Sequence, residues 1–386
     1  MPAQISHILA AEEALLRGAP ALAEAWGLGV KAKGGWAVGK ETTEAAAWFR
    51  LGAQGPDIFY HNQRTHPSGL HYGPLCHRRN YGLTVEAMCA ALIDAGTATA
   101  SPEAAWLLGF ATHAAVDRVI HPFIVYFSGW QLPLVPESAR YRSCHPFLER
   151  LLDIDILARL RGLSIGDCDL EDLLPLGAKE KRTEFSAPGP GANERLDGAV
   201  VRLIATGLRA AFPRAAVADF LIERRIQNAL ADARYFLRVT NPALTSAGSA
   251  SLLPWFDDRS GWRSMALIYP EALPEGLDIA NEARNTWEHP AGDGRSRSNS
   301  HAELFEEAIQ HAAEAVAMVV SSLEKGGMEA GFATAIGNGG LSVTDGDGIP
   351  VPPRLSQPLA LKEAMEKEFE RRIAFEREWT SRTRPL

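Results

Sequence analysis

The stretch GFATHAAVDRVIHPF, residues 109–123, places three ionisable side chains on a segment that is otherwise mostly apolar or small. His113, Asp117 and His121 follow one another at intervals of four residues. In an α-helix, side chains four residues apart share one face and lie about 6 Å apart along the axis. Because burying such groups without partners is costly, the stretch predicts a helix whose polar stripe binds metal ions.

The helical rise also predicts two metal sites instead of one. His113 and His121 would lie about 12 Å apart along a straight helix, whereas a Zn–N bond is only about 2.0–2.1 Å long. One ion cannot bind both histidines, but His113 and Asp117 can share one. Pro122 disfavours helical geometry at the residue before it, so we expect the helix to end or bend at His121.

A second motif supplies ligands for the second site. CHPFLER, residues 144–150, repeats the His-Pro-Phe that ends the first stretch, and Pro146 can start a helix at its first position. His145 and Glu149 are again four residues apart. Together with His121 they provide two imidazoles and a carboxylate, a set typical of a catalytic zinc site with an open position for water.

Three further residues are candidate ligands of the first site. LGAQGPDIFYHN, residues 51–62, ends a helix in a Gly-Pro turn and presents Asp57. His71 follows in GLHYG, where the neighbouring glycines suit a ligand that must approach an ion closely, and His7 lies on the first expected helix. A single histidine is more often a hydrogen-bonded core residue, so the proposed set omits the remaining six: His61, His66, His77, His289, His301 and His311.

Helical patterns dominate the chain and convincing alternating strands are absent, so we predict an all-α, multi-helix bundle with long loops. Capping signals support several of the helices; for example, Ser101 and Pro102 suit the N-cap and the first helical position. Helices are expected over residues 3–17, 41–51, 82–96, 101–120, 145–161, 193–212, 216–235, 264–268, 301–325 and 358–380.

The expected organisation is one helical domain followed by a linker and a terminal helix. The domain covers residues 1–330 and is interrupted by a polar excursion at about 163–192. Residues 331–357 are rich in Gly and Pro and are expected to form a linker. The terminal helix, residues 358–380, has an apolar stripe that should pack on the body or on a partner chain: Leu361, Met365 and Phe369.

Composition excludes several classes of protein. The 386 residues contain no run of 18 apolar residues, so no transmembrane segment is expected. The first residues lack the pattern of a signal peptide, which favours a cytoplasmic location. A net charge of −8 argues against a general nucleic-acid surface, although metal ions would still allow a small phosphate ester to bind. Four cysteines without CxxC spacing are expected to be free thiols: Cys76, Cys89, Cys144 and Cys168.

The motifs GAQGPDIFYHN, LHYG, GFATHAAVDRVIHPFIVY and HPFLE, in this order, resemble the bacterial zinc-dependent phospholipase C family, which is related to the P1/S1-type nucleases. The resemblance covers roughly residues 1–160, with a looser similarity over 281–320. It implies an all-α phospholipase C / P1 nuclease-like fold around a cluster of two or three Zn²⁺ ions.

The resemblance also implies individual roles. One zinc ion would be held by His71, His113 and Asp117, and the second by His121, His145 and Glu149. Asp117 would in addition reach a third ion together with His7. Asp57 corresponds to the carboxylate that either binds the first zinc ion or orients and deprotonates the attacking water.

The chain departs from the family pattern at two positions. Secreted members hold the third zinc ion with an N-terminal tryptophan, whereas this sequence begins MPAQISH. Ile58 stands where members that cleave phosphatidylcholine carry an aromatic residue. The number of ions and the substrate headgroup are therefore left open.

The sequence predicts a zinc-dependent phosphoric ester hydrolase of the phospholipase C type. Its substrate would be a small phosphate ester or a phospholipid, attacked at phosphorus by a zinc-activated water with help from Asp57. One alternative is a 3′-nucleotidase or nuclease on the same cluster, with Tyr60, Tyr72 or Phe123 stacking on a base. Another is a non-catalytic, metal-stabilised helical binding protein. The oligomeric state is left open.

Overall fold

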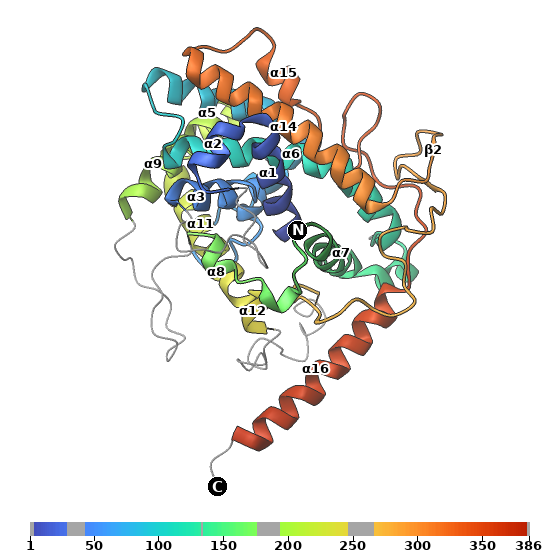
Figure 1. Ribbon diagram of the computed structural model, residues 1–386. Coiled ribbons are helices and arrows are strands. Elements are labelled where there is room, and N and C mark those ends of the chain that lie inside the picture. Colours follow the sequence, from blue (N-terminus) through green and yellow to red (C-terminus); the bar gives the residue numbers. More distant parts are fainter. Residues whose placement is uncertain (1–3, 29–42, 133, 176–193, 246–265, 384–386) are drawn as a thin grey trace.

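The computed structural model describes residues 4–28, 43–132, 134–175, 194–245 and 266–383 (Figure 1). Over these residues the predicted all-α fold is confirmed. The described α-helices are α1 (Gln4–Gly18), α2 (Pro20–Ala25), α3 (Glu44–Gly52), α4 (Tyr72–Arg78), α5 (Tyr81–Asp94), α6 (Pro102–Ser128), α7 (Cys144–Arg161), α8 (Leu170–Leu173), α9 (Glu194–Ala211), α10 (Pro213–Ala216), α11 (Ile222–Val239), α12 (Pro242–Thr245), α14 (His301–Lys325), α15 (Phe332–Ile336) and α16 (Leu361–Thr383).

Short elements complete the described fold. Three 3₁₀ helices connect longer helices: η1 (Gly55–Phe59), η2 (Pro136–Tyr141) and η3 (Ile165–Asp167). Two short strands, β1 (Trp287–Glu288) and β2 (Ser296–Arg297), pair in an antiparallel hairpin. Of the expected helix over 264–268, the first two residues lie outside the described part of the chain, and residues 266–268 form no helix.

Helix α6 is the centre of the bundle. It packs against α14, which lies across it in Figure 1, and also against α3, α1, α5 and α7. Its N-terminus is capped as expected, because the Ser101 side chain accepts a hydrogen bond from the backbone N–H of Ala104. Glycine permits the close approach of α3, since a Cβ atom at Gly109 would lie 2.0 Å from the carbonyl oxygen of Phe49.

The first alternative, that this helix ends at His121, is wrong, because α6 continues through Pro122 to Ser128. A proline inside a helix costs about 3 kcal/mol or more, through a lost hydrogen bond and a clash with the preceding turn. The turn that follows is buried, with Phe123 and Val125 fully inaccessible and Ile124 2% exposed. Their burial offsets the cost, since each such side chain contributes about 1.5–3 kcal/mol. The helix stops at Gly129, whose φ is 71°.

The two segments expected to be loose contain packed residues. In the described part of the polar excursion, residues 163–175, Ile165, Leu170 and Leu173 are buried; residues 176–192 lie outside the described part. The expected linker over 331–357 contains α15, which packs against α5, and the backbone N–H of Leu341 donates to the carbonyl oxygen of His77. The division into domain, linker and terminal helix stays a prediction.

The terminal helix α16 joins the body at its first turns. Leu361 and Met365, two members of the expected apolar stripe, are 0 and 3% exposed, and the helix contacts α7. Figure 1 shows the remainder of α16 extending away from the bundle.

Candidate metal centre

The candidate site lies where helices α1, α4, α6 and α7 meet the 3₁₀ helix η1. Together these elements contribute eight imidazole and carboxylate side chains: His7 from α1, Asp57 from η1, His77 from α4, His113, Asp117 and His121 from α6, and His145 and Glu149 from α7. Seven of the eight were predicted from the sequence. The eighth, His77, is not in the predicted set, which names His71 instead.

A buried carboxylate fixes helix α1 beside the site. Asp153 of α7 accepts hydrogen bonds from the backbone N–H groups of Ile5 and Ser6, at 3.2 and 2.7 Å. These N–H groups belong to the first turn of the helix, where they lack intrahelical partners and where negative charge is favourable. Tyr269 donates a further hydrogen bond to Asp153, at 2.7 Å. This anchoring sets the position of the next residue, His7.

The turn before Asp57 passes directly over His113. Gly55 has a φ of 56°, and a Cβ atom there would lie 2.3 Å from Cγ of the His113 ring. Only glycine fits this conformation and this contact without strain. The same turn supplies the carbonyl oxygen of Ala53, which lies 3.1 Å from Nδ1 of His113.

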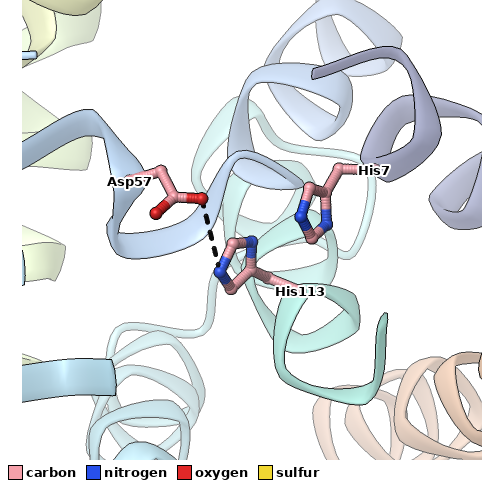
Figure 2. Close-up of side chains that lie close together, drawn as sticks. All are labelled: His7, Asp57 and His113. Carbon is pink, nitrogen blue, oxygen red and sulfur yellow. Dashed lines mark ion pairs between the residues drawn. The ribbon is translucent and has the colours of Figure 1, made fainter. Parts of the chain in front are cut away.

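His7, Asp57 and His113 form the first of three groups of potential ligands, each with its ligand atoms within 4.8 Å of one another (Figure 2). The rings of His7 and His113 stack with their centroids 4.3 Å apart. Nε2 of His113 lies 3.6 Å from Oδ2 of Asp57. All three side chains are almost completely buried, so the polar atoms have little access to bulk water.

His77, His113 and Asp117 form the second group. Nε2 of His77 lies 3.1 Å from Oδ1 of Asp57 and 3.6 Å from Oδ2 of Asp117. His71 is in none of the groups found among the described residues; its ring instead packs against Tyr72, with centroids 4.1 Å apart. Six residues of helix rotate a side chain by about 240° and move it about 9 Å, so α4 cannot present both histidines to one site.

His121, His145 and Glu149 form the third group. Nε2 of His145 and Nε2 of His121 lie 3.0 and 3.5 Å from Oε1 of Glu149. The His145 and His121 side chains are 18 and 11% exposed, whereas Glu149 is 1% exposed. The third group is therefore more open to solvent than the group of His7, Asp57 and His113.

Asp117 connects the groups. Its Oδ1 lies 3.2 Å from Nε2 of His7 and 3.7 Å from Nε2 of His121, while its Oδ2 lies 3.2 Å from Nε2 of His113. The two oxygens of this carboxylate thus face different groups, with His113 and His121 on opposite sides of it along α6.

Neighbouring histidines keep the three carboxyl groups ionised. Burial alone would raise the pKa of Asp57, Asp117 and Glu149, but the facing imidazoles outweigh burial and lower each of these pKa values. Burial lowers the pKa of His145, which favours the neutral imidazole that a metal ion requires. For His121, burial is outweighed by Asp117 and Glu149, so its pKa is raised.

Two histidines turn Nε2 toward the carboxylates. A carbonyl oxygen can only accept, so the contacts from Nδ1 of His113 to Ala53 and from Nδ1 of His77 to Gly73, at 2.8 Å, place a proton on Nδ1. Nε2 of each ring is then the atom that faces Asp57 and Asp117. It donates to a carboxylate when the ring is protonated, and it is free to bind a metal ion when the ring is neutral.

The arrangement fits Zn²⁺. Two ligands of a tetrahedral zinc ion lie roughly 3.3 Å apart, given bond lengths of about 2.0–2.2 Å. The distances between Nε2 and carboxylate oxygen within the three groups scatter around this value, from 3.0 to 3.6 Å. Among the described residues, several of these ligand atoms are buried without a hydrogen-bond partner: Asp57 Oδ2, His113 Nε2, Asp117 Oδ2, Glu149 Oε1 and Glu149 Oε2.

A cavity adjoins the third group. One residue of the cavity wall is His301, which was expected to be an ordinary core histidine. His301 is 1% exposed, and its Nδ1 has no hydrogen-bond partner among the described residues. It belongs to none of the three groups. The cavity is lined by Ser6, His7, Val116, Asp117, Ile120, His121, Ile124, Glu149, Leu152 and His301.

The bundle and its buried histidine–carboxylate groups define a helical protein built around a candidate metal centre. More specifically, the model of the zinc-dependent phospholipase C family matches residues 6–183, a span that contains all eight residues of the centre. The match confirms the resemblance for this part of the chain and, with the three groups, supports a metal-dependent, phospholipase C-like activity. Searches of curated proteins and of solved structures found no match.

Two further observations bear on the setting of the site. None of the described helices combines the length and the apolar composition needed to cross a bilayer. The four cysteines are buried free thiols and belong to none of the three groups.

Proposed function

We propose that the protein is a zinc-dependent hydrolase of phosphodiesters. The observation that carries this proposal is the orientation of His77 and His113, whose Nε2 atoms converge on the carboxylates of Asp57 and Asp117. A cluster of divalent cations satisfies all four groups, and the match to the phospholipase C family supplies the class of reaction. The ligand set proposed for the cluster is His7, Asp57, His77, His113, Asp117, His121, His145 and Glu149.

When bound here, Zn²⁺ would neutralise phosphate charge and lower the pKa of a coordinated water toward neutrality. The residues of the chain have separate tasks. Asp57 stays ionised, and its Oδ2 has no hydrogen-bond partner, so it can take the proton of the attacking water. The water oxygen bonds to phosphorus and the bond from phosphorus to the ester oxygen breaks. The ester oxygen leaves as the alcohol after gaining the proton that Asp57 took from the water.

The access side of the site follows from the exposure of its ligands. His77, His121 and His145 retain 11 to 18% exposure, while Asp57, His113 and Asp117 are at most 2% exposed. A substrate phosphate therefore approaches from the side of the three partly exposed histidines. Asp57 is 2% exposed, so bulk water has little access to the proton that Asp57 takes from the attacking water.

The proposal is tested by zinc analysis combined with hydrolysis of a soluble chromogenic phosphodiester. Zinc-loaded protein should turn the diester over, and chelated protein should not. Asp57→Asn should lower kcat by about 10²–10⁴-fold, the usual contribution of a positioned general base. His113→Ala should lower zinc content as well. His311→Ala is the control, because His311 is 53% exposed on α14. Full activity in zinc-free protein would contradict the proposal.

A 3′-nucleotidase or nuclease activity is the second candidate, and one aromatic residue favours it. Tyr72 and Phe123 are fully buried and cannot stack on a base, but Tyr60 is partly exposed, with its ring 5.1 Å from that of His77. Comparing mononucleotides with glycerophosphodiesters as substrates separates the two activities. Tyr60→Ala should impair only the hydrolysis of mononucleotides. Retained zinc without any turnover would identify a non-catalytic binding protein.

A further inference from the structure

The segment that follows α6 exposes large apolar side chains. Trp130, Leu132, Leu134 and Val135 are 43, 38, 93 and 40% exposed, and we call these four residues the apolar rim. Single exposed hydrophobic residues are common on soluble proteins. Four within six positions of one loop form a patch of the kind that marks an interaction surface.

Hydrogen bonds hold the rim in this exposed conformation. The backbone N–H of Leu132 donates to Oγ of Ser138 at 2.8 Å, and this hydroxyl in turn lies 2.6 Å from the carbonyl oxygen of Val135. The backbone N–H of Val135 donates to the carbonyl oxygen of Leu132 at 3.1 Å. Ser138 is 6% exposed, so a buried anchor supports the turn that carries Leu134 outward.

The rim borders the access side of the candidate metal centre. The ring of Trp130 meets the ring of His145 edge-on, with centroids 6.3 Å apart and an interplanar angle of 88°. His145 is the most exposed imidazole of the third group, at 18%. An apolar surface that contacts the rim is therefore brought close to the metal ligands.

We propose that the apolar rim inserts into the hydrocarbon of a lipid layer and so presents headgroup phosphodiesters to the metal centre. A Trp beside aliphatic residues suits the boundary of a bilayer, where the indole ring lies at the headgroup level. The exposed Glu137 and Arg140 follow the rim on η2 and keep this border polar. The net charge of −8 gives no attraction to anionic lipid, so a zwitterionic layer is the fitting surface.

The role given to this surface in catalysis rests on the proposed function, but its binding to lipid can be measured separately. The probe is a vesicle of pure phosphatidylcholine, and the readout is co-sedimentation of the zinc-loaded full chain. Leu134→Ser and the double variant Leu132→Ser/Leu134→Ser should reduce binding by roughly tenfold or more, the loss expected for one or two buried leucine side chains. Leu134 is 93% exposed, so its replacement should leave the fold and the zinc content unchanged. Leu132 is 38% exposed, so the zinc content of the double variant is measured alongside its binding.

Phe220→Ser is the matched control. Phe220 is 91% exposed, but it lies between α10 and α11, outside the rim. Its replacement should leave vesicle binding unchanged. The rim variants should also keep wild-type turnover of the soluble chromogenic diester while losing turnover of the vesicle lipid.

Three results would overturn the inference: rim variants that bind vesicles like the wild type, equal loss in Phe220→Ser, or a wild-type dimer that the rim variants dissociate. Analytical ultracentrifugation detects the last case, in which the rim contacts a second copy instead of lipid. Vesicle binding that depends on the rim, without any turnover, would retain the inference and reject the proposed function. Turnover of the soluble diester without vesicle binding would reject the inference and retain the proposed function.

Discussion

Oδ1 of Asp117 lies 3.2 Å from Nε2 of His7, and this contact joins the first helix, α1, to the central helix, α6. The same carboxylate faces His113 and His121 on its own helix. His77 of α4 is the fourth imidazole beside it. A carboxylate with four imidazoles around it can bridge two ions that are about 3.5–4 Å apart. Asp117 is therefore the residue through which the three groups of ligands would act as one cluster.

Replacing Asp117 with Asn should remove more than one equivalent of zinc. Loss of a residue that only hydrogen-bonds a metal ligand weakens metal binding by about 10–100-fold, and loss of a bridging ligand should exceed that. Zinc content by elemental analysis and turnover of the chromogenic diester provide the measurement. Glu103→Gln, at the start of the same helix, is the control and should retain both. Unchanged zinc content in Asp117→Asn would exclude a bridging role.

Replacing His77 and replacing His71 should have different effects on zinc content. His77→Ala should lower zinc content, because its Nε2 lies 3.1 Å from Asp57 and 3.6 Å from Asp117. His71→Ala should leave zinc content unchanged, because its ring packs on Tyr72 away from the three groups. Elemental analysis of both purified variants decides between them. Loss of zinc from His71→Ala alone would favour the ligand inferred from the family resemblance over the one that the structure places in the site.

The difference between these two histidines shows how far the sequence leads. Pairs four residues apart on one helix, such as His113 with Asp117 and His145 with Glu149, can be found from helical periodicity alone. The choice between His71 and His77 depends on how α4 is rotated against η1. That rotation follows from tertiary packing, and GLHYGPLCHRR offers both histidines without a local signal to separate them.

The continuation of α6 past Pro122 and the packing found within residues 331–357 have the same origin. Local rules end a helix before Pro122, but burial of Phe123 and Val125 in the core stabilises its continuation. Gly and Pro content predicts a linker over residues 331–357, but Leu341 is fully buried and bonded through its backbone to His77. In both cases long-range burial outweighs a local preference, and only the local preference is visible in the sequence.

Gly55→Ala should disturb the metal centre without changing any ligand. The new Cβ atom would lie 2.3 Å from the His113 ring, and a φ of 56° is strained for alanine. We expect the variant to lose about 1–3 kcal/mol of stability and to bind zinc more weakly, because His113 must move. Chemical denaturation and a zinc titration measure the two effects. Gly96→Ala is the control, since Gly96 has a similar φ of 61° but open space around it.

His301 should make the zinc-free protein sensitive to acid. Burial lowers the pKa of His301 to about 4, below its ordinary value of 6.5. As the pH falls from about 6.5 to 4, the unfolded chain takes up a proton that the folded chain does not, so the folded state loses up to about 3 kcal/mol. Its ring contacts Phe123 and Phe305, so His301→Phe should keep the packing.

The measurement is the free energy of unfolding in urea, at a series of pH values and with chelator present to remove metal. His301→Phe should lose less stability than the wild type between pH 6.5 and 4, with the difference between the two proteins growing as the pH falls. His311→Phe should follow the wild type, because His311 is 53% exposed. Parallel curves for the wild type and His301→Phe would show that His301 takes up its proton in the folded state, which would require the cavity beside it to admit water.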